Sequence, residues 1–299
     1  MKEGYRLKPA PFEGLSTYRP PLCHELAGQT FTLVMDDGCT QELHLTDRNT
    51  LTLTSREDQA LADQPGKAPR EAAAKEQHCY TYECLKADDT IYFINLTETD
   101  ADTHTGRTYV LDLDTMLVTQ ARVTLGQNPR YPRMTSIHFT FGAIRKEDGS
   151  LNPLRHGYTA DMVGKAVNWN YAQFEIVHVY SSERYYRVTF SEERMAQLRR
   201  QMPENMEPPK DMPVYEDDAV YIRLRDHLYL VSLSEYILCR RNGHGNNLLF
   251  VMNLDTLHDV GRSFGTNGDW QDENYTVGAF GELFDASETL TKESTYYIR

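Results

Sequence analysis

The sequence lacks any apolar run long enough to cross a membrane. Its longest runs, such as 248–252, are far shorter than the roughly 20 residues that a membrane helix needs. The N-terminal residues contain no hydrophobic signal core, and the five cysteines show no CxxC spacing. We therefore expect a cytoplasmic protein with reduced thiols and no membrane partner.

Positive charge is also scarce. The chain has 31 Lys and Arg against 44 Asp and Glu, a formal net charge of −13, which argues against nucleic acid as the main partner. The sequence contains no phosphate-binding glycine loop, no cluster with metal-ligand spacing and no iron–sulfur cysteine pattern. We therefore expect neither a metal nor a cofactor.

What is present suits a folded two-domain protein. A length of 299 residues, with 40% hydrophobic and 25% charged residues, allows two domains that each bury a core. The 19 tyrosines favour half-buried strands and pocket walls, because tyrosine combines an apolar ring with a polar tip.

An internal repeat organises the chain. Four segments of the first half recur in the same order in the second half, with offsets between 136 and 141 residues. The matched pairs are 26–29 with 162–165, 91–98 with 228–235, 113–115 with 254–256, and 139–144 with 275–280. Four ordered matches with small drifts in offset indicate a gene duplication.

Each copy has the pattern of short strands. Segments 31–35 and 167–171 alternate apolar and polar residues, and clusters such as 36–38 and 242–245 supply turns. Seven or eight such strands in each copy predict an all-β protein made of two tandem antiparallel barrels, in which closure removes exposed strand edges. Inserts at 58–77 and 192–213 predict short helices over 70–75 and 195–201.

The repeat also predicts the domain organisation. The expected parts are an N-terminal extension (1–22), a first barrel (23–145), a linker (146–160), a second barrel (161–287) and a C-terminal tail (288–299).

The junction 155–165 and the following Trp169-Asn170-Tyr171 resemble the start of the second domain of the MoaF family. The strand 228–235 resembles a family segment that ends in Trp-Arg-Glu-Lys, with Leu233, Ser234 and Tyr236 in place of the tryptophan, arginine and lysine. The resemblance implies two lipocalin-like domains. The family name suggests molybdenum cofactor synthesis, but no motif in this chain supports that chemistry.

Segment 92–98 is similar, more distantly, to a strand of phenolic acid decarboxylases that ends in a Thr-Glu pair. Those enzymes also use two tyrosines, one residue apart, on their first strand. Here the matching positions hold Leu33 and Met35 in copy one, and Trp169 and Tyr171 in copy two. The set is incomplete in both copies, so the resemblance does not carry that activity over.

Residues two apart on a strand share a face, so each copy has a row of apolar side chains that ends in a glutamate. We expect both rows to face a barrel lumen: Tyr92, Ile94, Leu96 and Glu98 in copy one, and Tyr229, Val231, Leu233 and Glu235 in copy two. A carboxylate in an apolar lumen has a raised pKa and can act as a general acid or base near neutral pH. The alternative is that each glutamate meets water at the barrel rim.

Further candidates lie in the second copy. Trp169 and Tyr171 are expected to face the lumen, where they can stack against and orient a planar ligand or simply pack the core. His178 shares a strand face with Tyr180 and can transfer protons or serve as a core residue; His44 is its expected counterpart in copy one. Arginines around the Glu235 strand can clamp an anion or form surface pairs: Arg223, Arg225, Arg240 and Arg241.

These residues support three hypotheses. In the first, a barrel binds a small aromatic or planar metabolite and acts on it as a cofactor-free lyase, isomerase or cyclase, with Glu235, Tyr171, His178 and Glu98 as the acid–base groups. In the second, the protein is a ligand carrier or sensor without turnover. In the third, one barrel is a degenerate scaffold or a surface for homodimerisation. If a single barrel carries the site, the aromatic residues favour the second.

Overall fold

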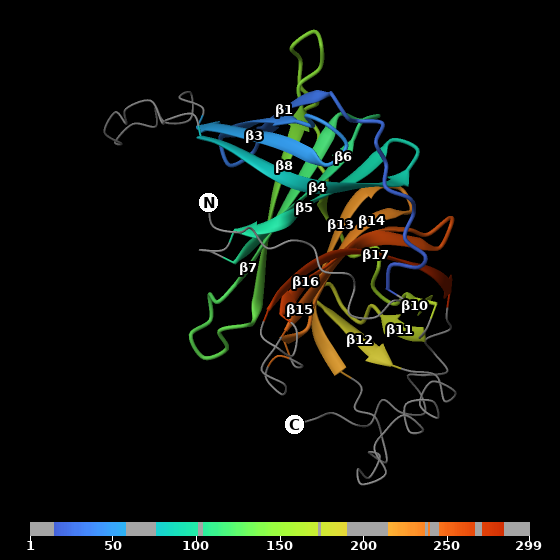
Figure 1. Ribbon diagram of the computed structural model, residues 1–299. Helices are drawn as coiled ribbons and strands as arrows, with labels where there is room; N and C mark the ends of the chain where they lie inside the picture. Colours follow the sequence, from blue (N-terminus) through green and yellow to red (C-terminus); the bar gives the residue numbers. More distant parts are fainter. Residues whose placement is uncertain are drawn as a thin grey trace, which may run out of the picture.

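In the computed structural model, antiparallel strands form two barrels, one above the other in Figure 1. The structure describes residues 15–57, 76–100, 104–172, 175–189, 215–236, 239, 245–266 and 271–283. The strands are β1 Thr30–Met35, β2 Cys39–His44, β3 Thr50–Glu57, β4 Glu76–Asp88, β5 Ile91–Asp100, β6 Thr105–Asp112, β7 Leu117–Leu125, β8 Thr135–Ile144, β9 Gly157–Tyr158, β10 Ala166–Asn170, β11 Glu175–Val179, β12 Tyr185–Thr189, β13 Tyr215–Arg225, β14 Leu228–Ser234, β15 Asn246–Asn253, β16 His258–Thr266 and β17 Asp272–Leu283.

Both barrels close in the same way. In the first, β1 to β8 pair in chain order and β8 returns to β1, with Leu33 opposite Ile144. In the second, β17 returns to β10, with Trp169 opposite Gly281, and β12 pairs with β13. The expected pair of tandem antiparallel barrels is therefore confirmed, and each ring has eight strands. The short strand β9, outside the ring, adds to β13 where β12 has ended.

The alternation of side chains places one apolar core inside each barrel. The first lumen is filled mainly by aliphatic residues, among them Leu33, Leu43, Leu53, Ile94 and Leu111. The second is mainly aromatic, with Trp169, Tyr171, Tyr180, Tyr186, Tyr221 and Phe250. The two copies therefore share a backbone fold, but the side chains inside it differ in type.

The duplication is confirmed by the strand register, with one correction. The turn after β6 is 141 residues before the turn after β15, so Val118 corresponds to Asp259. Val118 lies opposite Gly142 and Asp259 lies opposite Ala279, so the offset in the last strand is 137 residues. The sequence match of 139–144 with 275–280 is thus displaced by one residue. Such a slip matters, because it moves every side chain to the other face of the sheet.

The base of each barrel is closed by the same turn and the same polar cluster. Gly28 and Gly164 have φ values of 83° and 85°, a conformation that favours glycine, and each donates its N–H to the end of the second strand of its barrel. Beside each turn, a tyrosine hydroxyl donates to a carboxylate that also contacts a cation. The clusters are Tyr92–Glu25–Lys86 in the first barrel and Tyr229–Asp161–Arg223 in the second.

Outward-facing side chains join the barrels through an apolar cluster that includes Phe93 and Val110 of the first barrel and Leu230 and Val251 of the second. An ion pair lies beside this cluster: Arg225 of β13 donates through Nε to Oδ2 of the buried Asp112, at 2.9 Å. Although burial works against it, the contacts with His156 and Arg225 hold the pKa of Asp112 well below its usual range.

The segment before β1 crosses from one barrel to the other. We call residues 15–29 the strap; it is the blue trace that runs beside β17 in Figure 1. Leu15 packs against the second core and its carbonyl accepts the N–H of Gly278 at 3.1 Å. A Cβ at Gly278 would lie 2.6 Å from Cα of Arg19, so the strap can lie this close only over glycine. The strap therefore holds both barrels together.

The helices expected at 70–75 and 195–201 lie outside the described residues. Within the described part of the chain, no helix has the length and apolar character needed to cross a membrane.

Candidate functional site

The structure brings most of the predicted residues of the second copy into one lumen. Trp169, Tyr171, Tyr180, Tyr229, Val231 and Leu233 all belong to the buried core of the second barrel. His178 is 2% exposed and lies on the same face of β11 as Ile176, which packs against this core. Tyr229 lies nearer the base of the barrel than the others, because its hydroxyl donates to Asp161 of the base cluster.

In the first copy, Tyr92 and Leu96 face the first lumen as expected. The side chain of Glu98 lies outside the described residues, so its role stays a prediction. The expected correspondence of His44 with His178 is wrong. His44 lies opposite Thr30, whereas the equivalent Ala166 lies opposite Val179, so the counterpart of His178 is the buried Leu43.

An acid that the sequence patterns did not reveal faces the second lumen. Asp259 of β16 is fully buried, and its Oδ2 accepts a hydrogen bond from the Tyr171 hydroxyl at 3.1 Å. Its Oδ1 accepts the backbone N–H of Ala279. Burial raises the pKa of Asp259 to about 7, although both hydrogen bonds oppose that rise. Asp259 and Tyr171 replace the apolar Val118 and Met35 of the first barrel.

A second carboxyl group follows β14. Glu235 is partly buried, and desolvation, assisted by the charge of Asp217, raises its pKa to about 7. Asp217 is itself buried and lies opposite Tyr186, a core residue of this barrel. Burial and nearby carboxylates, Glu235 among them, raise the pKa of Tyr275 to about 12. Two groups of the lumen are thus able to exchange protons near neutral pH.

His178 adds an unsatisfied polar atom to this lumen. Its Nδ1 is buried without a hydrogen-bond partner, and its ring lies 5.5 Å from that of Tyr186 and 6.4 Å from that of Tyr180, both edge-on. Desolvation lowers the pKa of His178 to about 3, so the imidazole is neutral at pH 7. A neutral imidazole with an unpartnered nitrogen can accept or donate one hydrogen bond to a ligand.

Tyrosines surround these groups. The Tyr180 hydroxyl accepts the indole N–H of Trp169 at 3.3 Å, and the Tyr180 ring lies 5.6 Å from the ring of Tyr221. Sequence patterns missed Asp217, Tyr186, Tyr221 and Asp259. The segments that hold Asp217 and Asp259 do not alternate cleanly, and only the strand register shows that they face inward.

The first lumen has no comparable acid among its described side chains. One polar part of its interior is a neutral group in which Tyr109 donates to Gln41 at 2.9 Å and accepts from Gln120 at 2.8 Å. The strand register equates these three residues with Phe250, Ile176 and Gly261 of the second barrel. The polar atoms of this group therefore bond to one another within the first barrel.

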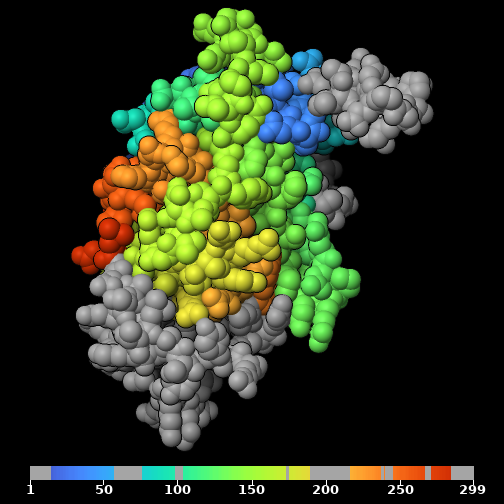
Figure 2. Space-filling view, turned by 180° about the vertical axis from the view of Figure 1, so that it is seen from behind, coloured from blue at the N-terminus to red at the C-terminus, as the bar shows by residue number. Residues whose placement is uncertain are grey.

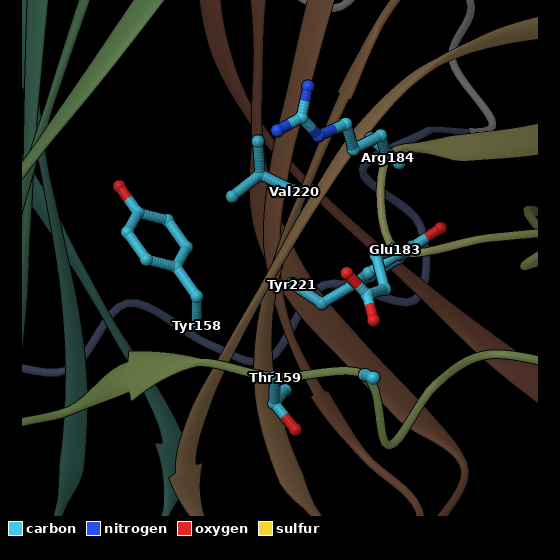
Figure 3. A pocket seen from close by; sticks show the side chains of 8 residues that line it. Tyr158, Thr159, Glu183, Arg184, Val220 and Tyr221 are labelled. Carbon is cyan, nitrogen blue, oxygen red and sulfur yellow. The ribbon is translucent and has the colours of Figure 1, made fainter.

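A pocket of about 480 Å³ opens on the wall of the second barrel (Figure 3). Its lining combines the end of β9 and the two residues after it (Tyr158, Thr159, Ala160), the turn before β12 (Glu183, Arg184) and β13 (Ala219, Val220, Tyr221). Ala219 and Tyr221 also belong to the core of the lumen. Here β13 passes from β12 to β9, and Figure 2 shows the linker lying beside β11 and β12 on this side of the molecule.

The two described arginines of the predicted set, Arg223 and Arg225, do not form an anion clamp near Glu235. Arg225 is engaged by Asp112 between the barrels, and Arg223 pairs with Asp161 and Asp226 at the base. Arg240 and Arg241 lie outside the described residues. Among the described side chains, no group of three or more His, Cys, Asp or Glu is placed to hold a metal ion.

The fold defines the chain as a protein of two tandem lipocalin-like barrels, with ionisable groups concentrated in the second. Comparison with family models confirms the resemblance to MoaF, because residues 12–127 match the MoaF N-terminal domain. The match covers the strap and β1 to β7, and the second barrel lies beyond it. No curated protein matches the chain.

Proposed function

We propose that the second barrel binds a small planar organic molecule in its lumen and transforms it by proton transfer, as a lyase, isomerase or cyclase that needs no cofactor. One observation carries the proposal. Where the first barrel has Val118, Met35 and Leu43, the second has Asp259, Tyr171 and His178, all buried. Burying ionisable groups destabilises a fold, and pKa values shifted by burial cluster at functional sites.

The geometry supports defined roles. The Asp259 and Glu235 carboxyls, with pKa values of about 7, can each take or give a proton at neutral pH. Tyr171 donates to Asp259 and can orient it, while Trp169 offers a flat apolar wall. The unpartnered Nδ1 of His178 is a hydrogen-bonding position for the ligand. Proton transfer between such groups is the step common to lyases and isomerases that act without a cofactor.

The duplication provides a matched test of where the ligand binds. Leu96 and Leu233 occupy equivalent inward positions and are both fully buried. Phenylalanine at either position adds the same bulk to one lumen. With the neutral fluorescent probe N-phenyl-1-naphthylamine, we expect the wild type and Leu96→Phe to bind with the same affinity and Leu233→Phe to lose binding.

Probe binding lost in Leu96→Phe and kept in Leu233→Phe would assign the site to the first barrel and refute the proposal, as would a wild type that binds no probe. Far-ultraviolet circular dichroism checks that each variant is folded. Native mass spectrometry of the purified chain then identifies a retained ligand. With that ligand, Glu235→Gln should keep binding and lose turnover. A variant that keeps both would show that Glu235 is not a catalytic group, and a wild type that binds the ligand without converting it would be a carrier.

A further inference from the structure

The second lumen carries acids without matching cations. The described inward side chains include the carboxyls of Asp217, Glu235 and Asp259. On β10 to β17, the one described Lys or Arg with inward strand parity is Arg223. It lies at the base, half exposed, and is already paired with Asp161 and Asp226. An anionic ligand in this lumen would meet acidic groups and no free cation among the described side chains, which disfavours its binding.

Aromatic side chains fill much of the same lumen. Three of these side chains are fully buried and form a chain of contacts. Trp169 donates a hydrogen bond to Tyr180, and the ring of Tyr180 meets the ring of Tyr221 edge-on. Aromatic faces attract ammonium groups, most strongly where water is excluded. Acids and aromatic faces together form the type of site that binds quaternary or protonated amines.

The first barrel shows the opposite arrangement. Arg107 lies opposite Leu96 and so faces the first lumen, where its guanidinium lies 5.8 Å over the Tyr80 ring and donates to the Tyr80 hydroxyl. That lumen holds its own cation, already placed on an aromatic ring. The described inward side chains of the first barrel thus include a partly buried cation, Arg107, whereas those of the second include buried acids.

We propose that the ligand of the second barrel is an organic cation, a planar or aromatic molecule that carries a protonated amine or a quaternary ammonium group. This inference rests on the proposed function, because it names the class of molecule that the same lumen takes. Asp259 and Glu235 supply the counter-charge, and Trp169 and the tyrosines supply the faces.

Competition against bound N-phenyl-1-naphthylamine tests the charge preference. The competitors are phenyltrimethylammonium, its uncharged isostere tert-butylbenzene, and benzoate. We expect phenyltrimethylammonium to displace the probe at a concentration about tenfold or more below that of tert-butylbenzene, and benzoate to be the weakest. Asp259→Asn and Glu235→Gln should each weaken the cation by about tenfold and leave tert-butylbenzene unchanged. Glu282→Gln, at an exposed position of β17, is the control.

Equal or tighter displacement by tert-butylbenzene or benzoate would overturn the cation inference while leaving the proposed site intact, since the probe itself is bound. A wild type that fails to bind the probe would overturn the proposed function as well. Loss of the cation preference in Glu282→Gln would show that surface charge, and not the lumen, produces it.

A different observation points to a second site, at the base of the first barrel. Leu22 forms an antiparallel bridge with Leu85, which places Cys23 of the strap directly opposite Cys84 of β4. The Cys23 N–H donates to the Cys84 carbonyl at 2.8 Å. Side chains of opposed residues lie on the same face, and Cα atoms of such hydrogen-bonded pairs are about 5.5 Å apart, within the range of disulfides. Both cysteines are free thiols packed against the first core.

We infer that Cys23 and Cys84 are a redox pair that closes under peroxide. The partly exposed Cys23 thiolate attacks hydrogen peroxide, the O–O bond breaks, and a sulfenic acid forms with release of hydroxide. The Cys84 thiol then displaces water from that sulfenic acid, and the S–S bond forms. In total, two thiols and one peroxide give one disulfide and two waters. The bond ties the strap, which also holds the second barrel, to β4.

Titration of the full chain with hydrogen peroxide tests this site. We expect the intact mass to fall by about 2 Da, two of the five thiols to become inaccessible to iodoacetamide after denaturation, and the Tm to rise by about 5–10 °C because a long loop is closed. Cys23→Ser and Cys84→Ser should each abolish the change, and Cys39→Ser should not. A disulfide that persists in Cys23→Ser, or a mass gain from oxygen alone, would refute the pair.

Discussion

Replacing Asp259 by asparagine should change how the stability of the protein depends on pH. Asp259 is fully buried and its pKa is raised from 3.8 to about 7, first by desolvation. The folded protein therefore holds this proton more tightly than the unfolded chain. Its contribution to stability is complete below about pH 4 and is lost as the pH rises through about 7. Between pH 5 and pH 8 this group alone removes about 2–3 kcal/mol of unfolding free energy.

Urea unfolding of the wild type and Asp259→Asn at pH 5 and pH 8 measures that contribution. The variant should lose about 2–3 kcal/mol less than the wild type between the two pH values, because asparagine does not titrate. Taking this difference cancels the opposite effect of His178, whose lowered pKa destabilises the fold as the pH falls below about 6.5. Glu282→Gln, exposed on the same sheet, is the control. Equal pH slopes in the wild type and Asp259→Asn would refute a buried, neutral Asp259.

Three further variants test the packing. Asp112→Asn should keep its turn and cost about 1–3 kcal/mol in urea unfolding, because the ion pair with Arg225 is lost; unchanged stability would contradict that pair. Gly261→Ala should lower the Tm by several degrees or prevent folding, since its Cβ would lie 2.1 Å from the Leu249 carbonyl oxygen, and a wild-type Tm would contradict this contact. Tyr109→Phe should cost about 1–2 kcal/mol in chemical denaturation by leaving two glutamine amides short of a partner, and no loss would show that the amides re-pair.

Periodicity and repetition were sufficient to predict the two barrels and the inward rows that hold Tyr92 and Leu233. Both signals can be seen in the sequence alone, because neither depends on knowing which strands pair. The repeat was less reliable in β17, where two plausible alignments differ by one residue and assign opposite faces. Only the pairing of Val118 with Gly142 and of Asp259 with Ala279 decided between them.

The acids of the site show why part of it was missed. Asp217 lies in a run of three acidic residues, a pattern typical of a solvated surface, and Asp259 is the second residue after a hairpin turn. Extending the offset of that turn by a few residues would have paired Asp259 with Val118 and shown an apolar position changed to an acid. The ion pair of Asp112 with Arg225 joins residues 113 apart and has no signal in the sequence.

The protonation of the two carboxyls can be observed directly in the intact chain. Carbon-13 carboxyl spectra recorded from pH 4 to pH 9 should show two signals with midpoints near 7, one absent in Asp259→Asn and the other in Glu235→Gln. Both midpoints should fall when phenyltrimethylammonium is added, since a bound cation favours the charged carboxylates. Midpoints near 4 for both carboxyls, unchanged by the cation, would contradict a proton-exchanging site in the second barrel.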